Sequence, residues 1–182
     1  MSEHLQHRDI VRRCKRGDRK AQNQLYRLYS KAIYNICLRM VNNEMDAEDI
    51  LQTSFVYVFM KMDSFRFEST IGAWIKRIVI NNCINHIKRK KMRFEARDEG
   101  FKQVEDESPE PMIQDSDLDV KKVKMAIGQL PDGYRTVFTL YTMEGYDHQE
   151  IGEILDISEA TSKSQYSRAK KKLKSLLIGG TV

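Results

Sequence analysis

Hydrophobic residues recur three or four positions apart along most of this 182-residue chain, which is the spacing of one helical face. The pattern predicts helices over residues 9–16 and 19–42, a third from an N-cap at Asp46 to about Met62, and a fourth over 70–93. No segment alternates long enough to build a sheet, and no proline interrupts the chain before Pro109. The sequence therefore predicts an all-α fold.

The second half continues the helical pattern and adds a helix-turn-helix. Stripes over residues 120–130 and 131–141 predict two more helices. Ile151, Ile154 and Leu155 then share one helical face, which ends before Ser158, a residue suited to cap the next helix. That last helix is polar, rich in small residues and increasingly basic, as expected of a helix that lies in a DNA major groove.

Charge divides the chain into two basic parts. The net charge is +5 and the isoelectric point is about 9.0. Ten acidic and two basic residues between Glu95 and Asp119 give that stretch a charge of −8, which leaves +13 on the rest. Such a proline-containing acidic stretch predicts a flexible linker. We therefore expect two small helical domains, residues 1–94 and 119–182, joined by a linker over 95–118.

Several classes of protein are not expected. No run approaches the ~18 apolar residues of a membrane span, and the first residues lack the apolar core of a signal peptide, so we expect a cytoplasmic protein. Three widely spaced cysteines predict free, mostly buried thiols rather than a metal or redox site. The four histidines are scattered, and neither HExxH nor a phosphate-binding glycine loop occurs, so we expect no enzyme activity, no cofactor and no metal.

The fourth helix and the loop before it carry candidate chemistry for nucleic acid. Two aromatic residues stand in the polar loop 63–70, and polar residues recur on one helix face until a basic run over 88–93. A solvated helix end explains the basic run alone equally well. Aromatic rings, asparagine amides and cations together favour unpaired DNA, because they can stack on bases, pair with base edges and neutralise phosphates.

Three stretches resemble the small, two-domain extracytoplasmic-function (ECF) class of bacterial RNA polymerase sigma factors. Residues 46–55 (DAEDILQTSF) are similar to the helix that binds the polymerase clamp. Residues 65–69 (FRFES) with 74–81 (WIKRIVIN) are similar to the promoter-melting segment. Residues 130–138 (LPDGYRTVF) with 144–151 (EGYDHQEI) are similar to the domain that binds the −35 element.

This resemblance implies a transcription initiation factor whose two domains bind core RNA polymerase and promoter DNA. Its partners would be the clamp coiled coil of the largest subunit, the flap of the second largest subunit, promoter DNA and an anti-sigma factor. The implied polymerase-binding residues are Asp46, Glu48, Asp49, Gln52, Thr53 and Val56. The implied −10 DNA-binding residues are Phe65, Arg66, Phe67, Glu68, Ser69, Trp74, Arg77, Asn81, Asn85 and Lys88. The implied −35 DNA-binding residues are His148, Thr161, Ser162, Lys163, Ser164, Gln165, Ser167, Arg168 and Lys171.

The chain departs from the family pattern at a few positions. Phe67 stands where the family usually has glycine, Ile71-Gly72 where it has an aromatic pair, and Gln165 where arginine is frequent. A glutamine cannot make the bidentate contact of arginine to guanine, so we expect a shifted or relaxed −35 preference.

Alternative interpretations remain open at the level of sequence. The acidic residues that begin the third helix could simply favour the helix dipole. The acidic linker could mimic RNA in the exit path that it threads in the family, or have no such role. A dimeric helix-turn-helix repressor or activator would explain the second half of the chain, but not residues 65–93 or the linker.

Overall fold

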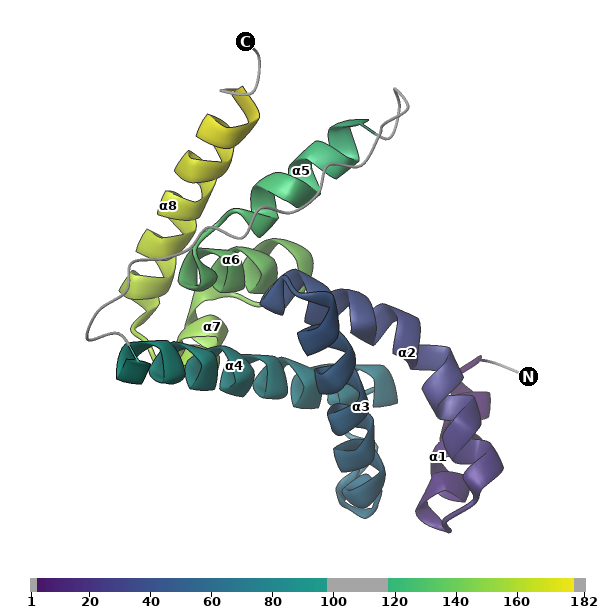
Figure 1. Cartoon of the computed structure of the whole chain (residues 1–182). Helices are drawn as coiled ribbons and strands as arrows, with labels where there is room; N and C mark the ends of the chain where they lie inside the picture. The colour runs from purple at the N-terminus through teal and green to yellow at the C-terminus, as the bar shows by residue number, and fades with distance from the viewer. Residues whose placement is uncertain (1–2, 98–117, 179–182) are drawn as a thin grey trace. The chain divides into compact units, whose positions relative to one another are not determined.

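A computed structural model of the chain describes residues 3–97 and 118–178, and every regular element in these two ranges is helical (Figure 1). This confirms the all-α prediction. The chain forms two compact units, residues 1–86 and 87–182, and the division lies within the long fourth helix. The domain boundary expected at residue 94 stays a prediction, and most of the acidic stretch lies outside the described residues.

The first unit is built from three helices and the first part of a fourth. They are α1 (Glu3–Lys15), α2 (Arg19–Val41), α3 (Glu44–Met60) and α4 (Ile71–Arg97), with a short 3₁₀ turn, η1 (Met62–Ser64), after α3. Helix α2 packs against both α1 and α3 (Figure 1). The apolar stripes predicted from sequence form the core, which contains Leu25, Ile33, Met40, Phe55, Val58, Ile75 and Val79, all nearly inaccessible to solvent.

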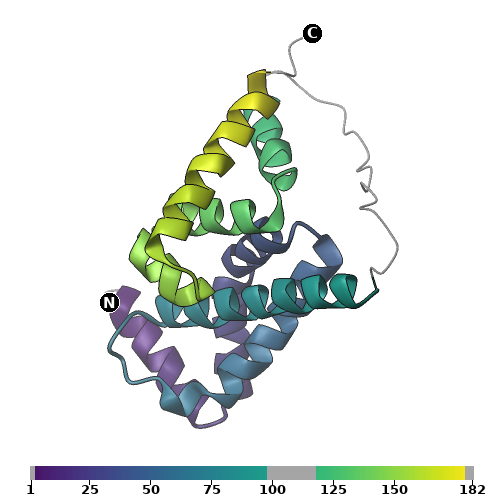
Figure 2. The same cartoon turned by 90° about the vertical axis from the view of Figure 1, so that its left-hand side faces the viewer.

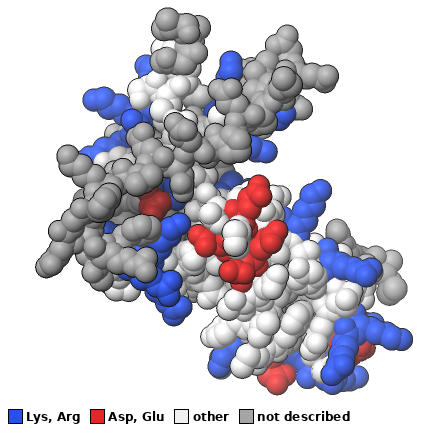
Figure 3. Space-filling model, viewed as in Figure 1, with Lys and Arg blue, Asp and Glu red and all other residues white. Residues whose placement is uncertain are grey.

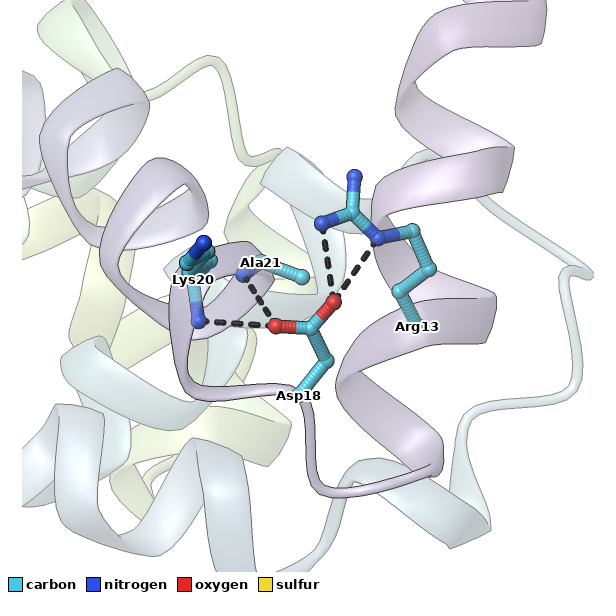
Figure 4. A network of polar contacts seen from close by, with 4 residues as sticks. All are labelled: Arg13, Asp18, Lys20 and Ala21. Atoms are coloured by element: carbon cyan, nitrogen blue, oxygen red, sulfur yellow. Dashed lines mark hydrogen bonds and ion pairs between the residues drawn. The ribbon is translucent and has the colours of Figure 1, made fainter.

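A polar network fixes the corner between α1 and α2 (Figure 4). Gly17 takes φ +77°, a conformation that glycine adopts without strain. One carboxylate oxygen of Asp18 accepts hydrogen bonds from the backbone amides of Lys20 (2.8 Å) and Ala21 (3.2 Å) and so caps α2. The other accepts two from the Arg13 guanidinium, at 2.9 and 2.8 Å. One side chain therefore ends one helix and begins the next.

This corner predicts a pH-dependent contribution to stability. The Arg13 hydrogen bonds and the capped amides lower the pKa of Asp18 below its ordinary value of 3.8. A carboxylate with a lowered pKa stabilises the fold above its unfolded-state pKa, and this stabilisation is lost as pH falls through the folded-state pKa. We expect Asp18→Asn to lower the urea midpoint at pH 7 and to make much less difference at pH 3. Fluorescence of Trp74, the chain's single tryptophan, follows the first unit, and an equal difference at both pH values would contradict the prediction.

The start of α3 differs from the sequence prediction. Asn42 ends α2 in the left-handed conformation, and Asn43 then caps α3 by accepting a hydrogen bond from the Asp46 amide at 2.9 Å. The prediction that Asp46 is the cap was wrong by one turn, because an asparagine three residues earlier serves equally well. The Asp46 carboxylate instead lies 3.2 Å from Nε2 of His86 on α4.

The second unit packs five elements. They are α5 (Leu118–Gly128), α6 (Asp132–Phe138), a π-helical turn η2 (Thr139–Met143), α7 (His148–Leu155) and α8 (Glu159–Ile178). Helix α8 packs on α5, α6 and α7, and Figure 2 shows it running across them. Its apolar side contributes Ala169 and Leu173 to a core with Ala126, Ile127 and Leu130. The sequence predicted the helix from residue 131 but not the π-helical end that follows it.

A buried arginine ties the entry of α6 to this core. Arg135 is only 5% exposed, and its guanidinium donates a hydrogen bond to the Leu130 carbonyl at 2.8 Å and pairs with Asp132. A buried cation needs such partners, because removing a charge from water without them costs several kcal/mol. The pair therefore holds the turn between α5 and α6.

The three cysteines are free and buried, as the sequence predicted. Burial raises the pKa of Cys14 to about 11, and a hydrogen bond with Cys37 together with burial raises the pKa of Cys83. In the ranges that the structure describes, no group of three His, Cys, Asp or Glu residues could hold a metal ion. No helix of these ranges is long and apolar enough to cross a membrane.

Candidate polymerase and nucleic-acid interfaces

Local hydrogen bonds shape the helix-turn-helix. A capping box starts α7: the Asp147 carboxylate accepts from the Glu150 amide, and the Glu150 carboxylate accepts from the Asp147 amide, both at 2.8 Å. Asp156 then takes the left-handed conformation (φ 60°) and ends the helix. Ser158 Oγ accepts from the Thr161 amide at 3.1 Å, which confirms the cap predicted for the last helix. These caps fix where α8 begins and which side it turns outward.

The outward side of α8 carries most of the residues expected at the −35 element. Lys163, Ser164, Ser167, Arg168 and Lys171 are exposed, and Thr161 and Gln165 are half-buried. A hydrogen bond and ion pair with Glu159, at 2.6 Å, raises the pKa of Lys163 and places its ammonium one helical turn from its own position on α8. Hydroxyl, amide and cationic groups on one helix face suit contacts to base edges and phosphates of a duplex.

Ser162 does not belong to this outward side. Its side chain is fully buried, and its hydroxyl lies 2.9 Å from Nδ1 of His148 on α7. The His148 ring is stacked on Tyr141, with the ring centres 4.4 Å apart, and its edge faces Tyr166. Ser162 is therefore turned away from the outward side. Its small side chain lets α7 and α8 pack closely, and its contact with DNA stays a prediction. His148 is half-buried in the same contact, and its binding of DNA stays a prediction.

The loop between η1 and α4 is anchored by Phe65. That ring is 3% exposed and packs against Trp74, at 5.3 Å between centres, and against Phe67, at 5.0 Å. Lys15 of α1 donates a hydrogen bond to the Phe65 carbonyl at 2.7 Å. The Phe65 ring is used in packing, and its binding of DNA stays a prediction. Arg66, Glu68 and Ser69 are exposed on the loop, and Phe67 and Trp74 are half-buried.

One stripe of α4 presents the other residues expected at the −10 element. Arg77, Asn81, Asn85 and Lys88 are all exposed, and the basic run continues exposed to Arg93. Their spacing of three or four residues places them on a single face. The buried side of the same helix is fixed to α3 by a hydrogen bond of 2.9 Å from the Asn82 amide to Ser54 Oγ. The fold therefore holds the amides and cations of this stripe on a rigid helix.

The exposed face of α3 is acidic at its start and apolar further on. Figure 3 shows a group of acidic side chains over the start of the helix, where Glu44, Glu48 and Asp49 are exposed. Gln52, Thr53 and Val56 continue that face, whereas Asp46 is half-buried beside His86. The sequence prediction missed Met45, Tyr57 and Met60, which are 77%, 46% and 74% exposed. Large apolar side chains beside carboxylates at a surface are a mark of a protein-binding face. The sequence did contain a signal for these three residues, because they are hydrophobic but lie outside the buried stripe of α3.

One unit carries a helix-turn-helix, and the other carries a surface helix, α3, that is acidic and apolar. Together they define a DNA-binding protein that also binds a protein partner. The family models for sigma-70 region 2 and sigma-70 region 4 match residues 25–93 and 121–173. The chain is 32% identical to ECF RNA polymerase sigma factor SigW of Bacillus subtilis over 177 residues, covering 92% of this chain and 94% of SigW. It is 30% identical to the ECF RNA polymerase sigma-E factor of Haemophilus influenzae, covering 94% and 95% of the two chains.

A solved structure agrees with these matches. The sigma factor RpoE from Bartonella quintana, in complex with the anti-sigma factor NepR, superposes with a TM-score of 0.61 and 25% identity, covering 85% of this chain and 95% of RpoE. The chain belongs to the ECF class of RNA polymerase sigma factors. It is a transcription initiation factor that binds RNA polymerase and promoter DNA.

Proposed function

We propose that the chain holds promoter DNA at two points and RNA polymerase at a third. The outward side of α8 reads the −35 element as duplex, through Thr161, Lys163, Ser164, Gln165, Ser167, Arg168 and Lys171, with His148 of α7 at its edge. One observation carries this proposal: the side chains of α8 named here share one accessible side of the helix. Helix α8 is the second helix of the helix-turn-helix, and Ser158 caps its start. The chain acts by binding rather than by catalysis.

The first unit captures the −10 element as unpaired DNA. Arg66, Phe67, Glu68 and Ser69 on the loop and Arg77, Asn81, Asn85 and Lys88 on α4 contact the strand, while Phe65 and Trp74 hold the loop in place. Flipping a base costs a few kcal/mol, which stacking and base-edge hydrogen bonds must offset. This division of labour agrees with the burial of Phe65, whose ring packs against Trp74 and Phe67.

The clamp coiled coil of the polymerase's largest subunit binds the exposed face of α3. Glu48, Asp49, Gln52, Thr53 and Val56 make this contact, and Asp46 supports it from its place beside His86. A basic coiled coil would be attracted by the carboxylates and would cover the apolar side chains. The second unit binds the flap of the second largest subunit, and the acidic stretch 95–118 links the two parts of the chain that the family models match, as the gap between the matches supports.

The similarity to a solved complex also supports a proposal about how the chain is regulated. The solved relative RpoE is bound to an anti-sigma factor, and we propose a partner of this kind for the chain, acting in the cytoplasm. Nothing in the family matches supports the alternative of a dimeric repressor.

The test of the proposal is co-purification with core RNA polymerase followed by run-off transcription on genomic DNA. Transcripts that start at defined sites only when the chain is added are the expected result. Failure to bind core polymerase would discard the proposal, and dimerisation without polymerase binding would favour a repressor.

Gln165 provides a test of −35 reading. Gln165→Arg introduces the bidentate guanine contact that the recognition helix lacks, so we expect preference to shift toward a guanine at one −35 position by about tenfold. Gel shifts with duplexes that differ at single −35 positions measure this change. Lys172→Arg, at an exposed position on the same helix, is the control, and an unchanged preference in Gln165→Arg would show that Gln165 does not face the bases.

A further inference from the structure

Lys15 of α1 is bonded to the backbone of the loop that precedes α4. Its ammonium group donates a hydrogen bond to the Phe65 carbonyl at 2.7 Å and a longer one to the Asp63 carbonyl at 3.3 Å. These carbonyls follow Lys15 by 50 and 48 positions, so the contact joins two distant parts of the chain. A hydrogen bond from a charged donor is roughly twice as strong as one between neutral groups. One cation therefore fixes the loop at two points.

The ring of Phe67 lies against the same helix. The Lys15 ammonium is 5.3 Å from the ring centre, and the Arg8 guanidinium carbon is 5.2 Å from it. Arg8 and Lys15 are two helical turns apart, so they share one face of α1. A cation this close to an aromatic ring is attracted to it. Helix α1 thus contacts the loop both at its backbone and at an aromatic side chain.

The backbone at Phe67 requires such support. Phe67 takes φ 62°, a left-handed conformation that a bulky side chain rarely adopts. A conformation of this kind is unfavourable on its own and persists only where surrounding contacts maintain it. Lys15 fixes the carbonyl of Phe65, two residues earlier, and also lies against the Phe67 ring. The unusual turn of the chain at Phe67 is therefore maintained from α1.

The exposed part of the loop lies between two fixed ends. At the first end the Phe65 ring is only 3% exposed, and its carbonyl is bonded to Lys15. At the second end Thr70 Oγ1 accepts a hydrogen bond from the Ala73 amide at 3.2 Å, where α4 begins. The exposed residues between these ends are Arg66, Glu68 and Ser69. Lys15 acts where the chain leaves the core and turns outward.

We propose that Lys15 is a positioning residue of the −10 site. Through the Phe65 and Asp63 carbonyls it holds the loop in the shape that presents its exposed side chains to the unpaired strand. A loop that is already ordered loses less conformational entropy when it binds. Lys15 acts through the loop and needs no contact with DNA of its own. The inference rests on the proposed function, because it deepens the −10 site.

The first experiment measures the order of the loop in the full chain, with neither DNA nor polymerase present. Trypsin cleaves after Arg66 when the loop opens, and mass spectrometry follows the fragment that ends there. Lys15→Met removes the ammonium but keeps an unbranched side chain, so we expect this cleavage to become about fivefold faster. Arg12→Met removes an exposed positive charge one turn earlier on α1. This control should change the cleavage rate by less than about twofold.

The second experiment measures the contribution of the loop to transcription. A promoter is first located by run-off transcription of genomic DNA with core polymerase and the parent chain. On that promoter Lys15→Met should initiate about fivefold less often. Its binding to core polymerase and to −35 duplex DNA should stay within about twofold of the parent chain, because both contacts are remote from the loop. Lys15→Arg keeps a cationic donor and should restore most of the lost initiation.

The proposal is overturned if Lys15→Met leaves the cleavage after Arg66 or the rate of initiation unchanged, or if Arg12→Met has effects of the same size. Equal losses in Lys15→Met and Lys15→Arg would also overturn it, because they would assign the effect to the shape of the side chain. Lys15→Gln replaces Lys15→Met if circular dichroism shows the latter to be unfolded. Failure of the parent chain to bind core polymerase would discard the proposed function, whereas the cleavage result would still decide whether Lys15 fixes the loop.

Discussion

Asp49→Lys is expected to weaken binding of core RNA polymerase by about thirtyfold or more, since facing like charges cost several kcal/mol at an interface. Asp49 is exposed on the acidic start of α3 and lies on the same face as Gln52 and Val56. Reversing one charge there replaces attraction to a basic coiled coil with repulsion. Fluorescence anisotropy of the labelled chain titrated with core polymerase measures the loss.

Two further variants separate the sources of this effect. Asp63→Lys makes the same charge reversal at an exposed position of η1, outside the proposed face, and should bind polymerase within about twofold of the parent chain. Val56→Ser removes an exposed apolar contact and should weaken binding by roughly fivefold, with little dependence on salt. The Asp49→Lys defect should instead shrink as salt rises. Equal losses in Asp49→Lys and Asp63→Lys would mean that net charge, and not this face, governs docking.

The helices were predictable because their signals are local. Periodic apolar residues predicted α2 within one residue of its observed end, and Ser158 marked a helix cap that the structure confirms. The error at α3 has a local cause as well: Asn43 and Asp46 are both good caps, and propensity cannot choose between them. The π-helical end of α6 reflects packing, which the sequence pattern does not encode.

The site was predictable in outline but not in the orientation of single side chains. Residues at three- and four-residue spacing on α4 do share an exposed face, as expected. The family resemblance placed Phe65 and Ser162 at DNA, yet both are buried, Phe65 against Trp74 and Ser162 against His148. The support that α1 gives to the loop before α4 was missed because the contact of Lys15 with the Phe65 carbonyl spans fifty positions.

Gly152 has no side chain, and this lets the turn between α7 and α8 pack closely in the DNA-binding unit. It lies buried in α7, and its carbonyl accepts hydrogen bonds from the Asp156 amide and, at 3.0 Å, from the Ile157 amide. A side chain at this position would lie 2.8 Å from the Ile157 carbonyl oxygen. The obstacle is backbone rather than a flexible side chain, so the turn between α7 and α8 would have to move.

Gly152→Ala is therefore expected to destabilise the second unit, although alanine is the better helix former. Helix propensity favours alanine by about 1 kcal/mol, whereas overpacking against backbone costs about 1–3 kcal/mol. The difference, a net loss of up to about 2 kcal/mol, would lower the melting temperature of this unit by up to roughly 15 °C. Circular dichroism should show the lower transition while Trp74 fluorescence, which follows the first unit, is unchanged. Binding to −35 duplex DNA should weaken as well.

Gly133 supplies the matched control for this substitution. It lies in the first turn of α6, where an added carbon would meet the Gln165 side chain, with the amide oxygen nearest at 3.4 Å. Gly133→Ala therefore adds the same methyl group to a helix of the same unit without a backbone clash, and propensity alone should leave stability equal or slightly raised. If both variants had the melting temperature of the parent chain, the turn between α7 and α8 could move without a loss of stability. The spacing of α7 and α8 would then not depend on Gly152. If Gly152→Ala alone melts early, the close approach that this glycine permits is what holds the recognition helix in its reading position.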